Sequence, residues 1–508
     1  MTKIFTLVLA TALSATMYAQ SDADALRYSM LDFGGTARSL GSGNAYGAIG
    51  GDMSSMSMNP AGLGIYRSSE FVFTPGLLSI NTESNYLGQT NTDSRYNFYM
   101  SNFGFVFSKI NPGKETATDG WVGGSFGIGY NRLANFNSST LYSGYNDESS
   151  LLNTYVDYLN ANGGTNPSDA FASDPFGAGL AWETYLINPL PSDSTQYYSV
   201  ITDGNVQQTK SIITKGGLNE VAISFAGNYG NRLFIGGTIG IPSIRYSNST
   251  VYTEADINQN HSDFEDFTLA DYTETNGIGI NAKFGLIYKI SDYFRVGASV
   301  HSPSLFSLSD TYYSSMSSGL DTSGSYSYDS PTGEFDYELI TPWRVIGSAA
   351  ITLKNIGFIS ADYEFVDYSE AGFNFNRSLD AGDLSYENTV NTNIDTKYGT
   401  VSNLRLGAEL MYDIFRFRGG YIISGTPFND GIAANGADFA KNTITAGVGI
   451  KEKSYFIDFA FSHATTTEYD IQYIYDNGAG VNEGATIDKS LNNFLLIKGE
   501  VSKQGLLG

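Results

Sequence analysis

The amino-acid sequence predicts an all-β protein, a transmembrane β-barrel of about 14 antiparallel strands with an N-terminal plug inside its lumen. Three observations support this fold class. The chain contains 57 Gly, 36 Tyr and 32 Phe but only 12 Pro, and aromatic residues favour strands whereas Gly is costly inside helices. Segments of alternating apolar and polar residues recur along the chain. Short polar turns alternate with long acidic loops, which is typical of a barrel with two different rims.

The first residues of the chain predict a signal peptide over residues 1–19. A positive start at Lys3 is followed by an apolar stretch from Ile4 to Leu13, and Met17-Tyr18-Ala19 supplies a small-residue cleavage site. The apolar stretch is too short to cross a membrane as a helix. We therefore expect an exported protein whose mature chain begins near Gln20.

The predicted strands carry apolar residues on one face and small or charged residues on the other. From Leu404 to Leu410, Leu and Ala alternate with Arg405, Gly407 and Glu409, and the segments FGFVF, GINAKFGLIY and FIDFAFS repeat this arrangement. No later window has the roughly 18 consecutive apolar residues of a transmembrane helix. We expect strands to begin near Phe71, Phe98, Trp121, Gln207, Leu233, Phe267, Arg295, Asp336, Gly357, Val401, Phe415, Thr443, Tyr455 and Asn492.

The connections between these strands differ in length. In a soluble sandwich the turns at the two ends should be similar, so the difference favours a bacterial outer-membrane barrel, which we assign to residues 68–508. Short turns are expected at Asn228–Arg232, Ser291–Tyr293, Lys354-Asn355, Asp413 and Lys451–Ser454. Long extracellular loops are expected at residues 137–206, which is the longest, and at 314–332, 374–397, 429–439 and 475–488.

Residues 20–67 precede the first strand and are expected to plug the lumen, because a barrel of this size is too wide for its own wall side chains to fill. Within this segment, MNPAGLG predicts a sharp bend, since Pro60 has no backbone N–H and biases Asn59 away from helix. The bend would place Leu63 and Ile65 against the inner wall. An ordinary surface loop is the alternative. Glycines that let the backbone turn in a confined space are Gly34, Gly35, Gly41, Gly43, Gly47, Gly50 and Gly51.

The stretch ARSLGSGNAYGAIGGDMSSMSMNPAGL, from Ala37 to Leu63, resembles the N-terminal hatch signature of the FadL/TodX family of outer-membrane transporters for long-chain fatty acids and other hydrophobic compounds. TPWRVIGSAA, from Thr341 to Ala350, adds a weaker match. The resemblance implies a fourteen-stranded barrel plugged by the hatch, with ligand released by hatch rearrangement or through a lateral gap in the wall. The match is specific at Arg38, Gly41, Ala45, Tyr46, Ala48, Asn59, Pro60 and Ala61, and Leu63 completes the predicted hatch residues.

Six basic residues are candidates for holding the carboxylate of an amphipathic ligand. Each lies opposite apolar residues in its strand pattern and is expected to face the lumen, where it can form a charge-assisted hydrogen bond while the alkyl chain packs on apolar side chains. Alternatively, these residues pair with Asp362, Glu364, Glu409 and Asp458 and stiffen the wall. The candidates are Lys283, Arg295, Arg344, Arg405, Arg416 and Arg418.

Composition argues against several classes of function. The formal net charge of −24, with no cluster of Lys and Arg, argues against a nucleic-acid partner. The absence of Cys excludes disulfides, Cys-ligated zinc, Fe–S clusters and thiol nucleophiles. His261, His301 and His463 have no metal-ligand spacing and are expected at exposed or rim positions, and no Gly-x-Ser-x-Gly elbow joins a strand to a helix. We expect no enzyme activity, no cofactor and no metal.

The function predicted from these observations and from the resemblance is passive uptake of long-chain fatty acids or other hydrophobic small molecules through a hatch-gated outer-membrane channel. Such a channel is expected to be a monomer and to contact outer-membrane lipids and lipopolysaccharide. One alternative is a structural or adhesive barrel whose acidic loops, such as Asp256–Asp266, bind a surface partner or Ca²⁺. The other is a general diffusion porin with an open lumen.

Overall fold

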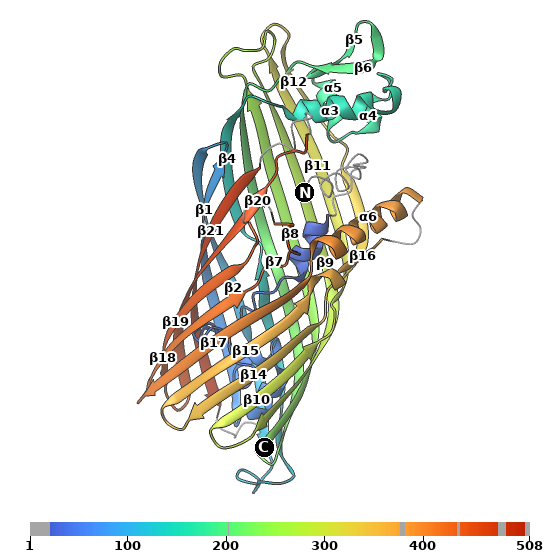
Figure 1. Ribbon diagram of the computed structural model, residues 1–508. Coiled ribbons are helices and arrows are strands. Elements are labelled where there is room, and N and C mark those ends of the chain that lie inside the picture. The colour runs from blue at the N-terminus through green and yellow to red at the C-terminus, as the bar shows by residue number, and fades with distance from the viewer. Residues whose placement is uncertain (1–20, 202, 376–380, 434–436, 476–483, 503–508) are drawn as a thin grey trace.

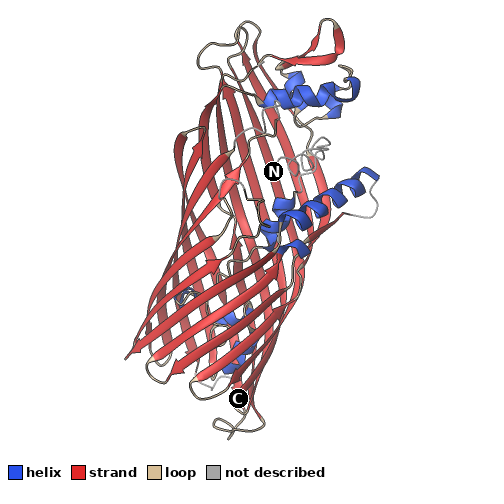
Figure 2. Ribbon diagram, viewed as in Figure 1, coloured by secondary structure: helices blue, strands red, loops and turns tan. Residues whose placement is uncertain are grey.

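The computed structural model is a closed β-barrel with the N-terminal part of the chain inside it (Figure 1, Figure 2). It describes residues 21–201, 203–375, 381–433, 437–475 and 484–502, so the predicted signal peptide lies outside the described residues. The barrel closes because the first strand, β1 (Ser69–Tyr86), pairs antiparallel both with β2 (Gln89–Ile110) and with the last strand, β21 (Ala485–Ser502).

Fourteen antiparallel strands form the wall, which confirms the predicted fold class. Ten of them are continuous, and four are each divided in two by a short break. Besides β1, β2 and β21, the continuous strands are β7 (Val206–Tyr229), β8 (Leu233–Ala255), β9 (Asp266–Lys289), β17 (Thr400–Tyr412), β18 (Phe415–Ser424), β19 (Lys441–Lys451) and β20 (Tyr455–Asp470). The divided ones are β3 (Trp121–Asn135) with β4 (Ser138–Asn146), β10 (Phe294–His301) with β11 (Leu305–Leu320), β13 (Gly333–Ile340) with β14 (Arg344–Leu353), and β15 (Gly357–Asp367) with β16 (Gly372–Phe375).

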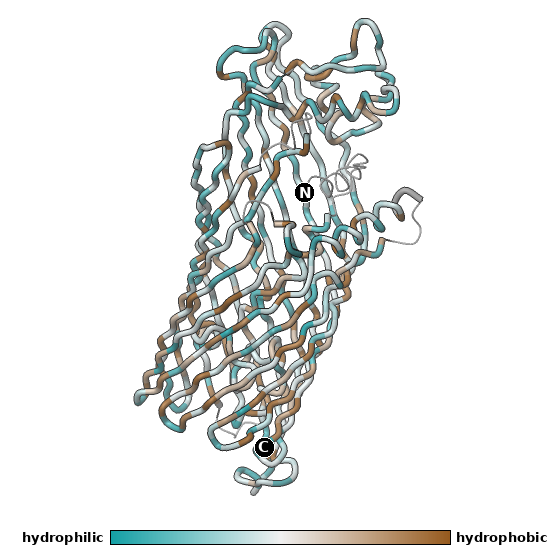
Figure 3. The backbone as a smooth tube through the Cα atoms, in the orientation of Figure 1, coloured by the Kyte–Doolittle hydropathy of each residue, from teal (hydrophilic) through white to brown (hydrophobic). Residues whose placement is uncertain are grey.

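The wall is apolar on its outer face and polar on its inner face, the reverse of a soluble protein. On β17, Leu406 and Leu410 are 41% and 55% exposed, whereas Arg405, directly before Leu406, is 4% exposed. Figure 3 shows hydrophobic residues recurring along the strands of the lower wall, while the loops at the upper rim are largely hydrophilic. Because an outward apolar band is what a lipid bilayer requires, the fold is that of a transmembrane barrel.

The two rims differ as predicted. Short turns at residues 230–232, 290–293, 354–356, 413–414 and 452–454 join neighbouring strands at one rim. At the opposite rim most connections are long, but β1 and β2 are joined by the two-residue turn Leu87-Gly88. Both turn residues have positive φ, 48° and 77°, as a tight hairpin requires.

Several predicted strand boundaries are wrong at the long-loop rim. The second strand begins at Gln89 and not near Phe98, and the last begins at Ala485 and not near Asn492. Beyond the apolar band, both faces of a strand carry polar residues. The alternation that reveals a strand in the sequence therefore disappears while its backbone pairing continues.

Three of the predicted long loops contain regular structure. Residues 137–206 begin with β4. Its sequence SSTLYSGYN has Ser and Tyr on both faces, so the period of two cannot be recognised in the sequence. Residues 314–332 include the end of β11 and the short strand β12 (Gly324–Asp329), and residues 374–397 include α6 (Ala381–Lys397). Parts of the loops predicted at 429–439 and 475–488 lie outside the described residues.

The rest of the longest loop folds into a small unit at the upper rim (Figure 1). Leu152 and Leu180 are fully buried there in one apolar cluster with Phe264 and Phe267. Among the described residues, no helix is long and apolar enough to cross a membrane. The elements of the unit are α3 (Leu151–Asn160), α4 (Ala170–Ser173), α5 (Ala178–Glu183), β5 (Ile187–Leu190) and β6 (Asp193–Ser199).

Residues 21–67, called the plug segment below, lie inside the barrel (blue in Figure 1). Met53, Met56 and Leu63 are fully buried in one cluster with wall residues such as Val106 and Leu495. Packing inside the lumen thus gives this short, Gly-rich segment a core that it lacks alone. Its elements are the helices α1 (Asp22–Ser29) and α2 (Ala37–Gly41) and the 3-10 helices η2 (Met53–Met56) and η3 (Pro60–Ile65).

Candidate functional site

The Asn59-Pro60-Ala61 step begins a helix, so the predicted sharp bend is wrong. Pro60 occupies the first turn of η3, where its missing N–H costs nothing. Asn59 caps the helix, because its Oδ1 accepts a hydrogen bond from the N–H of Ala61 (3.2 Å). Its Nδ2 donates to the carbonyls of Gly47 (2.7 Å) and Leu286 (3.2 Å). One side chain therefore starts the helix and joins it to strand β9.

Two wall glycines make room for this step. A Cβ added to Gly285 would lie 1.9 Å from Oδ1 of Asn59, and one added to Gly236 would lie 2.4 Å from the backbone carbonyl of Pro60. Only a residue without a side chain allows such an approach. Beyond the step, Leu63 is fully buried against the wall, as the sequence predicted.

Polar wall residues hold the neighbouring turns of the plug segment. Ser299 Oγ donates to the carbonyl of Met58 (2.8 Å), and Nε2 of His301 lies 2.8 Å from the same oxygen. Ser57 Oγ donates to Glu220 (3.0 Å). The expectation of an exposed or rim position is wrong for His301, which is 3% exposed. His301 ends β10, but this point is not at a rim of the barrel. The same barrel strand continues as β11 after a short break.

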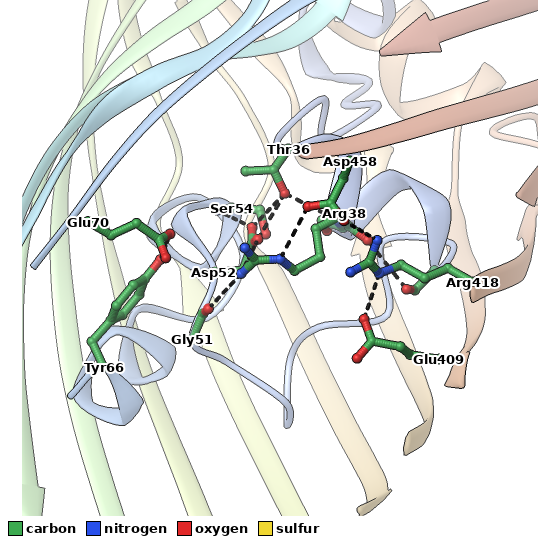
Figure 4. A network of polar contacts seen from close by, with 12 residues as sticks. Thr36, Arg38, Gly51, Asp52, Ser54, Tyr66, Glu70, Glu409, Arg418 and Asp458 are labelled. Atoms are coloured by element: carbon green, nitrogen blue, oxygen red, sulfur yellow. Dashed lines mark hydrogen bonds and ion pairs between the residues drawn. The ribbon is translucent and has the colours of Figure 1, made fainter. Parts of the chain in front are cut away.

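Arg38 links the plug segment to the wall through a buried ionic network (Figure 4). Its guanidinium lies 3.5 Å from Asp52 in the plug and 3.9 Å from Asp458 on β20. It also donates to the carbonyl of Gly51 (3.3 Å) and stacks 4.2 Å from the ring centre of Phe456. A buried cation needs such partners, and removing it would leave Asp52 without an ion-pair partner among the described residues, whereas Asp458 would keep Arg418.

The other predicted hatch residues also contact the wall. A Cβ on Gly41 would lie 3.1 Å from the Cα of Gly447, so the two backbones are in close contact. Tyr46 is 3% exposed and packs edge-to-face on Phe358, with 5.6 Å between ring centres. Gating by these residues remains a prediction.

Four of the six basic candidates form buried ion pairs with wall carboxylates. Lys283 pairs with Glu220. Arg344 and Arg405 each lie 2.9 Å from one of the two oxygens of Glu364. The fourth is Arg418 on β18, which lies 2.6 Å from both Glu409 and Asp458.

The remaining two candidates lie elsewhere. Arg295 donates to the carbonyl of Ile49 in the plug segment (3.2 Å). Arg416 donates to the carbonyls of Asp413 and Phe415 (both 2.7 Å) at a short turn. The structure therefore does not bring the six together, and a ligand-holding role for any of them remains a prediction.

A cavity of about 120 Å³ lies between the plug segment and the wall. Of its charged lining residues, three are basic and one, Asp32, is acidic, although the whole chain carries a net charge of −24. Asp32 pairs with Lys441. The apolar lining residues are Leu31, Phe33, Leu40, Leu78, Tyr99, Leu133, Ala134, Ile422, Ala464 and Leu491, and the other two basic ones are Arg132 and Arg405.

Arg132, like Asp32 and Lys441, is a charged cavity residue that sequence reasoning missed. By the alternation of β3 it belongs to the outward face with Ile128, but the strand register shifts between Arg132 and Ala134. Such a bulge re-aims the side chain, and no feature of the sequence marks its position. The Arg132 guanidinium lies over the ring of Tyr99 (5.4 Å), and that of Arg405 lies over Phe33 (4.9 Å).

The cavity adjoins a seam where two wall strands separate. Strands β2 and β3 pair only from Asn102 to Ile110 on β2. Above this point the plug segment takes the place of β2, since the N–H groups of Asp32 and Gly34 donate to the carbonyls of Leu133 (2.7 Å) and Arg132 (3.0 Å). The wall is thus closed here by residues of the plug segment.

The outer face beside the seam is apolar. Tyr96 and Phe98 on β2 are 70% and 74% exposed. Side-chain hydrogen bonds cross the gap, from Asn135 to Asn97 (3.1 Å) at the same level and from Ser139 to Asp93 (2.6 Å) above it. Two larger hollows, of about 490 and 700 Å³, are shallow and lie on the outer face of the wall, so they are not part of the lumenal site.

The acidic loop considered as a Ca²⁺ or partner site uses its carboxylates internally. Asp256 accepts hydrogen bonds from the N–H groups of Asn260 (2.9 Å) and His261 (2.6 Å). Asp263 accepts from the N–H (2.8 Å) and the hydroxyl (2.5 Å) of Thr322. These contacts order the loop and tie it to the hairpin of β11 and β12.

Comparison with solved structures finds the same fold in other proteins. The P. putida toluene transporter TodX matches with a TM-score of 0.54 at 12% identity, covering 93% of this chain and 100% of that one. A Pseudomonas aeruginosa FadL homologue matches with a TM-score of 0.55 at 11% identity, covering 92% and 98%. No protein-family model and no curated protein matches the sequence. The structural likeness confirms the fold that the hatch signature implied.

Proposed function

We propose that this protein is an outer-membrane channel for passive uptake of hydrophobic small molecules, gated by the plug segment, and that it has no enzymatic activity. The observation that carries the proposal is the cavity of about 120 Å³ between plug and wall, next to the seam between β2 and β3. A concave, largely apolar site with a few polar groups is the usual form of a small-molecule site.

The position of the cavity supports a route between the outside and the membrane. Its lining includes Asp32 and Gly34, whose N–H groups close the seam against β3. A ligand in the cavity is therefore one layer of backbone away from the exposed Phe98 on the lipid-facing side. Displacing residues 32–35 would open this layer, and we expect hydrophobic ligands to leave through it.

The packing of the plug segment favours selective uptake over general diffusion. The segment is held to β7, β8, β9 and β10 by hydrogen bonds and to β20 by an ion pair. Water and polar solutes would have to pass a buried network of charges and close-packed glycines. A general diffusion porin needs an open lumen, so this packing argues against that alternative.

Flux through proteoliposomes tests the proposal. We expect the purified protein to speed the entry of toluene and of a long-chain fatty acid into vesicles, because the cavity offers apolar surface along the route. Entry of a sugar should stay at the rate of protein-free vesicles. Equal acceleration of sugar and toluene would indicate a porin, and no acceleration of any hydrophobic compound would refute uptake.

A further inference from the structure

The two arginines that line the cavity have unused hydrogen-bonding capacity. Nε of Arg132 and Nη1 of Arg405 are buried and have no hydrogen-bond partner among the described residues. Arg132 also forms no ion pair within the described part of the chain, while its Nη2 donates to the carbonyl of Gly216. A buried N–H of a cation is costly to leave without an acceptor.

The rest of the lining has the opposite character. Leu31, Leu40, Leu78, Leu133 and Leu491 contribute apolar surface to the same cavity. The guanidinium groups lie over the rings of Tyr99 and Phe33, so each cation is flanked by aromatic surface. The cavity therefore combines a cationic side with an apolar side, which suits an anion that has an apolar body.

The volume of the cavity limits the size of its occupant. At about 120 Å³ it is slightly smaller than an engineered lysozyme cavity of roughly 150 Å³ that binds benzene. A single ring or a short chain fits entirely within such a space, whereas only one segment of a long alkyl chain could occupy it at a time.

From these observations we propose that the cavity binds a compact monocarboxylate, with a body the size of one aromatic ring or a short alkyl chain, whose carboxylate accepts hydrogen bonds from Arg132 and Arg405. This inference rests on the proposed uptake function and names the substrate class for the same cavity. A neutral hydrocarbon would leave both N–H groups without an acceptor, and it should bind more weakly.

Calorimetry on the intact protein in lipid nanodiscs tests the substrate class without any mutation. Benzoate and hexanoate are the carboxylate probes, while toluene and benzyl alcohol have similar bodies without charge. We expect benzoate to bind at least tenfold more tightly than toluene or benzyl alcohol, since one charge-assisted hydrogen bond accounts for a difference of that order. Equal or tighter binding of toluene, or no binding of either carboxylate, would overturn the inference.

Substitution of Arg132 tests the position of the carboxylate. Arg132→Gln is expected to weaken benzoate binding by about tenfold or more and to leave toluene binding unchanged. Arg132→Lys should recover part of the loss because it keeps the charge. Arg95→Gln is the matched control, since Arg95, on the neighbouring strand β2, is also an inward-facing arginine whose Nε has no partner among the described residues, but it does not line the cavity. Equal loss in both Gln variants, or none in Arg132→Gln, would contradict the assignment.

The two proposals fail in different ways. If toluene enters proteoliposomes but carboxylates bind no better than neutral compounds, uptake stands and the substrate class is wrong. If benzoate binds through Arg132 but no hydrophobic or amphipathic compound crosses the membrane, the cavity is a binding site and the channel function is wrong.

Discussion

Replacing Gly285 by Val is expected to turn a sealed barrel into a leaky one. The new Cβ would lie 1.9 Å from Oδ1 of Asn59, so the start of helix η3 must move away from β9. The cap on Ala61 and the hydrogen bond from Asn59 to Leu286 would then be lost. The wall itself should persist, because Gly285 keeps its place in the backbone pairing of β8 and β9.

Single-channel recording and swelling of proteoliposomes in a sugar solution measure this leak. We expect frequent openings and measurable sugar entry for Gly285→Val, against near-baseline values for the native protein. Gly347→Val is the matched control, because a Cβ at that wall glycine on β14 meets nothing within 4 Å. A tight Gly285→Val barrel, or equal leaks in both variants, would show that contact with the plug segment does not seal the lumen.

Replacing Lys283 by Met is expected to lower the free energy of unfolding by about 3–5 kcal/mol, the usual cost of leaving one partner of a buried ion pair alone. Glu220 is fully buried and would keep only neutral partners, such as Ser57 and Asn281. Urea unfolding in lipid vesicles, followed by tryptophan fluorescence, measures the change.

The double variant Lys283→Met, Glu220→Leu separates a structural role from ligand binding. Removing both charges should restore most of the stability, since no unpaired charge remains. If Lys283→Met instead keeps full stability and loses affinity for a carboxylate ligand, then Lys283 holds the ligand as the sequence analysis suggested.

The wall was predictable from sequence wherever it meets lipid. At Leu404–Leu410 the bilayer requires apolar residues outside and the filled lumen allows polar ones inside, so the period of two is strict. Beyond the apolar band this requirement ends, and strand β4 and the first half of β2 were therefore not identified. Breaks such as the one between His301 and Leu305 were also missed, because the pattern resumes after them.

The site was predictable only in part. The plug segment carries local signals, namely its glycines and the Asn59-Pro60-Ala61 step. The structure shows that this step packs directly against Gly285. The cavity is assembled from the plug segment and eight wall strands, so no local pattern marks it. Arg132 enters it through a bulge, and Arg405 was identified only as one of six equivalent candidates.

The most direct test of a plugged channel is the steady conductance of planar bilayers that contain either the intact protein or a variant without residues 21–57. We predict near-baseline conductance for the intact protein and a large, steady conductance for the variant, because the deletion removes Arg38 and most of the segment that fills the lumen while it leaves every wall strand in place. A variant as tight as the intact protein, or an intact protein as conductive as the variant, would contradict the account.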